Sequence, residues 1–159
     1  MKLLNLSTRE GFGQFVSVAG IFVNLLLSLV KLAIGIFSGA ISIIADGFNN
    51  LSDMGTSAVM LAGFKIAAKP ADEEHPFGHG RAEYLAGLFI AAAMILVGAN
   101  LLYSSVEKII EPQDLNVDAI TLLVLGISVA AKFFLGMFYR HAARKINSEA
   151  IGAAALDSF

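Results

Sequence analysis

Four apolar segments, each longer than the roughly 20 residues that a helix needs to cross the hydrocarbon core of a bilayer, dominate the sequence. They cover residues 12–37, 40–68, 83–110 and 119–139, and a fifth apolar run covers residues 148–159. Lipid offers no hydrogen-bond partner to exposed backbone, so segments of this kind fold as helices. The sequence therefore predicts an all-α polytopic membrane protein, a transmembrane helix bundle of four full spans plus the start of a fifth.

Composition agrees with a membrane protein and excludes several functions. Hydrophobic residues make up 57% of the chain and charged residues 15%, which is too apolar for a soluble domain of this size. The net charge of −2 gives no basic surface for nucleic acid, and no glycine-rich phosphate loop is present. The lack of cysteine excludes disulfides and thiolate metal sites. We also expect no removable signal peptide, because residues 1–12 lack an apolar stretch with a small-residue cleavage site.

Lysine and arginine collect at one set of span ends, and cytoplasmic loops carry such an excess. These residues lie before the first span, around the loop after the second, and after the fourth: Lys2, Arg9, Lys65, Lys69, Arg81, Arg140, Arg144 and Lys145. The opposite ends have Lys108 among four acids, Glu107, Glu111, Asp114 and Asp118. We therefore expect the amino terminus and the loop between the second and third spans to be cytoplasmic.

A polar stripe interrupts the second span. Asp46, Asn49, Asn50 and Asp53 recur at i, i+3, i+4 and i+7, which places them on one helix face about 10 Å long. An ionisable side chain at mid-membrane costs about 2.5–3.5 kcal/mol on insertion scales and usually marks an ion pathway. The pattern predicts a cation site, and the alternative is hydrogen bonding between helices.

A single acid, Asp157, interrupts the fifth apolar run. It lies about 13 Å from the start of a helix that begins near Ser148, a depth that resembles that of Asp53. We therefore expect Asn49, Asp53 and Asp157 to surround one ion, although spacing alone also fits a polar helix end. Two lysines near span ends, Lys31 and Lys132, are expected to extend to the membrane surface, and neither is expected to be catalytic.

The loop after the second span contains the pattern Asp72-x-x-His75-x-x-x-His79. Two imidazoles and a carboxylate at these spacings suit a borderline divalent ion such as zinc. The alternative is a turn that Gly78 and Gly80 allow, with both imidazoles in solvent.

Three motifs together resemble the cation diffusion facilitator family of divalent-metal exporters. They are Ala-Asp-Gly-Phe-Asn-Asn-Leu-Ser-Asp at 45–53, His-Pro-Phe-Gly-His-Gly-Arg-Ala-Glu at 75–83, and Ala-Leu-Asp-Ser at 155–158. The resemblance implies six membrane helices, a cytosolic carboxy-terminal domain, and a homodimer that exchanges cytosolic metal for protons. Residues 1–159 would then be a partial transmembrane domain that lacks helix six and the cytosolic domain. Such a part is not expected to transport unaided.

The resemblance also implies roles for individual residues. Asn49 and Asp53 match the helix-two pair of the family's transport site, and Asp157 matches the first member of a helix-five pair whose second member would be residue 161. Asp46 and Asn50 would support these ligands or lie along the route by which metal enters. Asp72, His75 and His79 correspond to a loop metal site that some members use.

Ligand chemistry points to the transported metal. Zinc-selective members of the family place histidine among the membrane ligands, whereas this chain has Asn49 and Asp157 there. An all-oxygen set suits manganese or magnesium more than zinc, and the pattern resembles the family's manganese exporters. We expect Mn²⁺ first, and an exporter of zinc, cobalt or iron remains open.

Two other classes compete with a transporter. A metal-dependent intramembrane hydrolase would need a motif such as His-Glu-x-x-His, which is lacking, so we expect no enzyme, no catalytic residue and no cofactor beyond the transported ion. A structural membrane subunit without transport is the other alternative. As an exporter, the chain would lie in the plasma (inner) membrane of a prokaryote.

Overall fold

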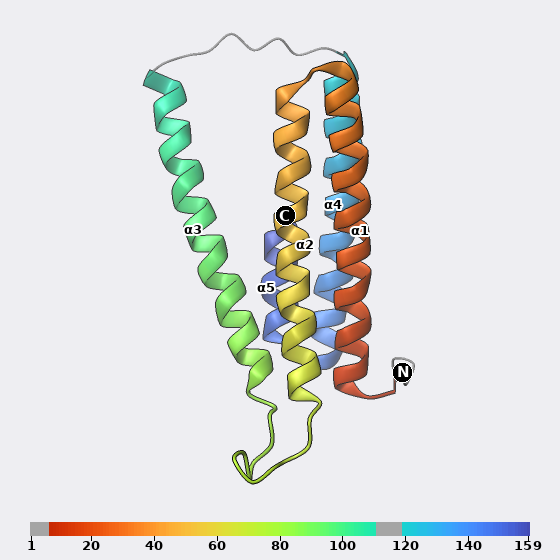
Figure 1. Ribbon diagram of the computed structural model, residues 1–159, viewed down its shortest axis with the longest axis vertical. Helices are drawn as coiled ribbons and strands as arrows, with labels where there is room; N and C mark the ends of the chain where they lie inside the picture. Colours follow the sequence, from red (N-terminus) through yellow and green to blue (C-terminus); the bar gives the residue numbers. More distant parts are fainter. Residues whose placement is uncertain (1–6, 111–118) are drawn as a thin grey trace.

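The computed structural model describes residues 7–110 and 119–159, apart from the side chains of Ile41 and Lys108. The helices are α1 (Arg9–Ser38), α2 (Ile41–Ala67), α3 (Ala82–Ile110), α4 (Ala119–Ile146) and α5 (Glu149–Asp157), with no strand in the described part (Figure 1). The predicted all-α fold is confirmed. Charged residues expected at span ends within 1–6 and 111–118, namely Lys2, Glu111, Asp114 and Asp118, lie outside the described residues.

The predicted span limits agree closely with the helices except in the fourth. That helix ends at Ile146 rather than at residue 139, because the basic residues assigned to a connection continue it. Arg144 and Lys145 lie in its last turn, where positive charge is favourable beside the free carbonyl groups of a helix end.

Three helices, α1, α3 and α4, are long and apolar enough to cross a membrane. Helix α2 is not among them, because its polar stripe lowers its hydropathy. It nevertheless lies beside α1 along nearly its whole length, joined by a tight turn (Figure 1). Gly39 makes this turn with a left-handed φ of 69°, a conformation that favours glycine. A bilayer that α1 crosses is therefore crossed by α2 as well.

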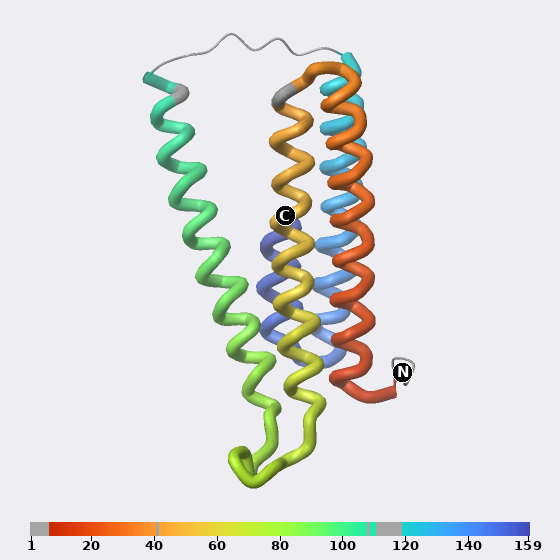
Figure 2. Tube along the Cα trace, viewed as in Figure 1, coloured from red at the N-terminus to blue at the C-terminus, as the bar shows by residue number. Residues whose placement is uncertain are grey.

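The helices form an uneven bundle. Figure 1 shows that α1, α2 and α4 run nearly parallel. Helix α3 is tilted: it starts beside the bundle at the 68–81 loop and diverges from the other helices toward its carboxyl end. The Cα trace in Figure 2 places this loop and the start of α1 at the same end of the bundle. The short helix α5 packs against α3 and α4 in the half of the bundle nearer that end. The charge pattern thus correctly grouped these segments, and which side faces the cytoplasm stays a prediction.

Apolar and polar side chains occupy different halves of the interior. All five helices contribute to an apolar core in the half that contains the loop, with Val16, Met60, Phe64, Ile90, Leu135, Tyr139, Ala142, Ala150, Ile151, Ala154 and Ala155. Beyond it, the buried side chains between α1, α2 and α4 include Asn24, Ser28, Lys31, Asn50 and Ser128. The bundle is therefore closed by hydrocarbon toward the loop end and polar inside toward the α1–α2 turn.

Arg9 fastens the loop end of the bundle. Its guanidinium donates to both carboxylate oxygens of Glu83 on α3, to the carbonyl oxygen of Ile146 at the end of α4 (2.8 Å), and to that of Asn147, the next residue (3.0 Å). Glu83 is almost fully buried, so this pairing supplies the partner that a buried carboxylate requires. Three helices are tied together where the apolar core ends.

Gly20 provides a test of this packing. A Cβ at this position would lie 1.5 Å from the Tyr139 hydroxyl, which is buried and hydrogen-bonded to Ser57 at 3.0 Å. We expect Gly20→Ala to destabilise the bundle by about 1–3 kcal/mol through overpacking, measured as a lower melting temperature in detergent. Gly98→Ala is the control, because a Cβ at Gly98 meets no atom within 4 Å. Equal melting temperatures for the two variants would contradict the close α1–α4 contact.

Candidate metal sites in the bundle and the loop

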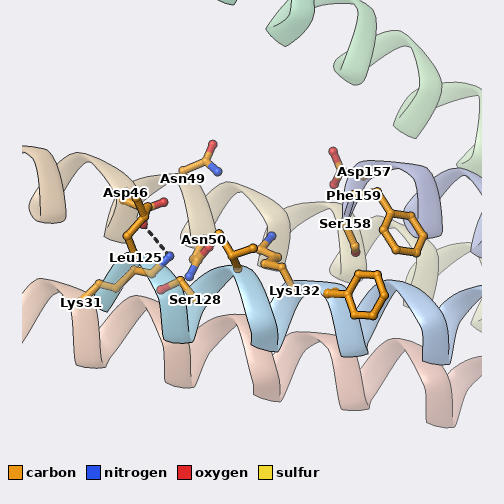
Figure 3. Close-up of a pocket in the computed structure, with 12 residues that line it drawn as sticks. Lys31, Asp46, Asn49, Asn50, Leu125, Ser128, Lys132, Asp157, Ser158 and Phe159 are labelled. Atoms are coloured by element: carbon orange, nitrogen blue, oxygen red, sulfur yellow. Dashed lines mark ion pairs between the residues drawn. The ribbon is translucent and has the colours of Figure 1, made fainter. Parts of the chain in front are cut away.

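The four residues of the polar stripe of α2 differ in how deeply they are buried. Asn50 is buried at 1% exposure, Asp46 and Asp53 are partly buried, and Asn49 is exposed. Figure 3 shows Asn49 on the side of α2 away from α1, the same side to which Asp157 points from α5. The two residues that the sequence placed in one site therefore extend from separate helices in a common direction.

Asn49 and Asp157 also line one cavity of about 280 Å³ between α1, α2, α4 and α5 (Figure 3). Its lining comprises Lys31, Asp46, Asn49, Asn50, Leu125, Ser128, Val129, Lys132, Phe133, Asp157, Ser158 and Phe159. Asp53 is not part of this lining, but it is paired with Lys132, which is. Asp157 in turn lies within electrostatic range of both Asp53 and Lys132. Asp157 thus interacts electrostatically with Asp53 and shares the cavity lining with Asn49.

Lys132 and Lys31 do not extend to the membrane surface, so that prediction is wrong. Lys132 forms an ion pair with Asp53, and their side chains are only 17% and 13% exposed. Lys31 is 3% exposed and pairs with Asp46 at 2.8 Å. Each ammonium finds a carboxylate on a neighbouring helix, which is closer than any headgroup and compensates the charge within the bundle.

The depth of Lys132 along its span was a sequence signal that this lysine needs an acidic partner, although it did not say which acid. Lys132 lies about 20 Å along α4 from Ala119, near the middle of the span, where a lysine cannot reach either surface easily. A lysine at mid-span therefore requires an acid on another helix, and Asp46, Asp53 and Asp157 are the candidates within the described spans.

Asn50 adds an uncommitted polar group to the cavity wall. Neither its Oδ1 nor its Nδ2 has a hydrogen-bond partner within the described part of the protein. A buried polar group without a partner costs about 1–3 kcal/mol, so this carboxamide favours a polar occupant of the cavity, such as water or a hydrated ion. Asp46 and Asn50 both lie on the side of Asp53 nearer the α1–α2 turn.

Local capping positions Asp157. Ser148 begins α5 by accepting a hydrogen bond from the Ile151 N–H at 3.2 Å, and Glu149 lies in the favourable first turn. Asp157 is the last residue of α5, and Ser158 caps its end. The end of α5, and the carboxyl terminus after it, lies near the height of the middle of α2 (Figure 1).

The second candidate site lies in the loop between α2 and α3. Asp72 Oδ1 lies 3.2 Å from His75 Nδ1, and Asp72 Oδ2 lies 3.4 Å from His79 Nε2. The candidate ligand atoms all lie within 4.8 Å of one another, the one such cluster of histidine and acidic residues in the described ranges. The structure therefore brings together the three residues that the spacing predicted.

Hydrogen bonds preorganise this loop cluster. The His75 backbone N–H donates to Asp72 Oδ1 at 2.7 Å, and this bond lowers the pKa of Asp72 below its usual value. His79 Nδ1 lies 3.2 Å from the Pro70 carbonyl oxygen, a contact that leaves Nε2 free to face Asp72. Gly78 has a φ of 75°, so the expected glycine turn is present together with the cluster.

Comparison with known proteins gives the family. The model of the cation efflux transmembrane domain matches residues 17–159. An uncharacterized transporter of Methanocaldococcus jannaschii is 38% identical over 83% of this chain and 47% of its own length. The manganese efflux system protein MneS of Bacillus subtilis is 35% identical over 92% and 49%. The cation-efflux pump FieF of Salmonella typhi is 33% identical over 91% and 49%. The chain spans about half the length of the curated relatives it matches.

The match to the family model runs through the polar stripe of α2, the loop cluster and α5. They confirm the expectation that the chain is not an enzyme, because the family and the named relatives are transporters. Together with the apolar helices, they make the chain part of an integral, multi-pass membrane protein. The chain belongs to the cation diffusion facilitator family of cation efflux transporters.

Proposed function

We propose that this protein exports divalent metal cations, with Mn²⁺ preferred, from a site that Asn49, Asp53 and Asp157 form between α2 and α5. The observation that carries the proposal is the common cavity of Asn49 and Asp157, together with an Asp53 carboxylate that interacts electrostatically with Asp157. Two carboxylates balance the charge of a divalent ion, and the amide supplies a third oxygen. A structural subunit has no comparable need for two acids at this depth.

The donor set supports manganese as the first choice. Carboxylate and amide oxygens are hard ligands that suit Mn²⁺, whereas zinc sites commonly include imidazole or thiolate. The relative named as a manganese efflux protein, MneS, agrees with this choice, and the cation-efflux pump FieF keeps other divalent ions open. Zinc, cobalt or iron export is therefore the alternative within the same mechanism.

The mechanism we propose is alternating access coupled to protons. The conformation described here is closed toward the loop end by the apolar core and by the Arg9–Glu83 pair, and its polar cavity extends toward the α1–α2 turn. Carboxylates bind metal when deprotonated and release it when protonated, so a proton gradient can drive release. If the loop end is cytoplasmic, Asp46 and Asn50 lie on the outward route, not on the inward route that their sequence positions suggested.

The loop cluster is proposed as a second metal site. Asp72, His75 and His79 offer one carboxylate and two imidazoles, a set that suits Zn²⁺. Because these ligands are outside the spans, the site is suited to binding metal at the membrane surface. Its proposed role is to stabilise the loop when metal is present.

The proposed assembly is a homodimer in a lipid bilayer. Helix α3 leans away from the bundle and exposes large apolar side chains, among them Leu88, Phe89, Ile95, Leu96 and Leu102. Surfaces of this kind contact lipid or another membrane helix.

Replacing the Asp53 carboxylate tests the proposed transport site. We expect Asp53→Asn, in the protein as its gene encodes it, to lower Mn²⁺ flux into vesicles under a pH gradient by on the order of 100-fold. Ser52→Ala is the matched control, because Ser52 is exposed on the same helix and bonds only within it. Equal flux for Asp53→Asn and Ser52→Ala would count against the assigned site.

Replacing the amide ligand tests the metal assignment. We expect Asn49→His to raise the ratio of Zn²⁺ flux to Mn²⁺ flux by about 10-fold, because an imidazole replaces a hard oxygen with a borderline nitrogen ligand. Flux of each ion, measured in the same vesicle preparation, gives the ratio. An unchanged ratio would show that Asn49 does not contact the ion.

The loop site predicts a specific zinc-binding defect and a pH dependence. Asp72→Ala should weaken Zn²⁺ binding by about 10–100-fold, measured by calorimetry, whereas Glu74→Ala, an exposed acid in the same loop, should not. Binding should also weaken as pH falls, because protons compete with the metal for the ligand atoms, and the lowered pKa of Asp72 moves the loss of its carboxylate charge to lower pH. Zinc affinity that is the same in both variants would exclude the cluster as the site.

A further inference from the structure

We propose that Lys132 is the resident counter-cation of the transport site: its ammonium pairs with Asp53 in the metal-free protein and is displaced when a divalent ion binds. This inference rests on the proposed function, because it assumes that Asp53 is a ligand of the transported ion. It assigns a role to a residue of α4, a helix that carries none of the expected ligands.

The contact itself is well placed for such a role. Lys132 lies near the middle of α4, and its Nζ reaches across to Asp53 on α2, with both side chains largely withdrawn from the surface. A single buried charge at this depth is strongly disfavoured, so the two charges compensate each other. Without bound metal, the site thereby carries one uncompensated negative charge, that of Asp157, in place of two.

Charge balance requires the lysine to leave when metal arrives. Asp53 and Asp157 together carry two negative charges, which match one divalent ion. With Lys132 still against Asp53, the loaded site would carry an excess positive charge in a medium of low dielectric, where like charges repel strongly. The lysine also occupies an oxygen that the metal needs. Ion and ammonium therefore compete for the same carboxylate.

The structure provides room for this displacement. Lys132 lines the same cavity as Asn49 and Asp157, and its four-carbon stem allows the ammonium to move within that space. The nearby Ser57–Tyr139 hydrogen bond, at 3.0 Å, also joins α2 to α4. The contact between these helices therefore does not depend on the Lys132–Asp53 pair alone.

The second ion pair of the bundle lacks these features. Lys31 and Asp46 join α1 to α2, two helices of one tight hairpin that pack along their length. Asp46 is also two helical turns from Asp53 along α2, about 10 Å away. Lys132 is thus the ammonium that contacts an expected ligand directly.

Displacement by charge gives a selectivity that the ligands alone do not provide. A monovalent cation that replaced the ammonium would leave the charge of the site unchanged, whereas a divalent ion neutralises both carboxylates. The resident ammonium therefore disfavours sodium and potassium, and it lets the metal-free protein change conformation with Asp53 paired.

Equilibrium binding of Mn²⁺ tests the proposal. The protein as its gene encodes it, in lipid nanodiscs and with His75→Ala and His79→Ala to remove the loop site, is titrated with Mn²⁺. We expect Lys132→Gln to bind Mn²⁺ at least about 10-fold more tightly, because the competing charge is gone. Lys65→Gln controls for net charge, since Lys65 is exposed near the end of α2, and it should leave the affinity unchanged.

A second variant keeps the test decisive if Lys132→Gln does not fold. Lys132→Arg retains the positive charge, and its planar guanidinium can donate two hydrogen bonds to one carboxylate. Because this cation competes more strongly for Asp53, we expect Mn²⁺ binding to weaken several-fold. Unchanged or weaker binding in a folded Lys132→Gln protein, or unchanged binding in Lys132→Arg, would overturn the proposal.

A parallel titration of Asp53→Asn separates this inference from the proposed function. Loss of Mn²⁺ binding in Asp53→Asn, together with unchanged affinity in both Lys132 variants, would overturn the role of Lys132 and leave the transport site intact. Equal Mn²⁺ affinity in Asp53→Asn and in the protein with Asp53 intact would overturn both the role of Lys132 and the proposed transport site.

Discussion

The structure depends on the requirement that charge inside a membrane be paired. At the level of the cavity, four charged side chains of the described residues form two ion pairs, Lys31 with Asp46 and Lys132 with Asp53. Each pair joins two helices, so the same contacts that compensate the charges also position α1, α2 and α4 around a polar cavity. The fifth charge, Asp157, lies within electrostatic range of the second pair without a lysine of its own among the described residues. This imbalance is what makes the cavity suited to a cation.

The two halves of the bundle have complementary tasks. Hydrocarbon packing among all five helices, together with the Arg9–Glu83 pair, closes the loop end, while the polar cavity lies beyond it. An ion that reached the cavity could not pass the loop end without separating packed side chains. The proposed alternating access would therefore require the apolar core to open, and the close contact of Gly20 with Tyr139 marks one place where α1 and α4 would have to separate or move together.

Much of the fold could be predicted from the sequence, because span length and apolar composition leave helices as the one solution in lipid. The loop cluster of Asp72, His75 and His79 was equally predictable, since three ligands within eight residues meet through local turns. The ion pairs were not, because periodicity gives the face of one helix and not the neighbour that it meets. For that reason Lys132 was expected to extend to the membrane surface, and its partner became evident only when α4 was placed beside α2.

The central claim is that oxygens from α2 and α5 converge on one divalent ion. Anomalous X-ray diffraction from crystals of the protein soaked in Mn²⁺ tests it most directly, because the signal locates the metal independently of the protein atoms. The account predicts a peak between the two helices, within about 2–2.5 Å of carboxylate oxygens of Asp53 and Asp157. A peak at the loop with none between α2 and α5, under conditions in which the protein transports manganese, would contradict it.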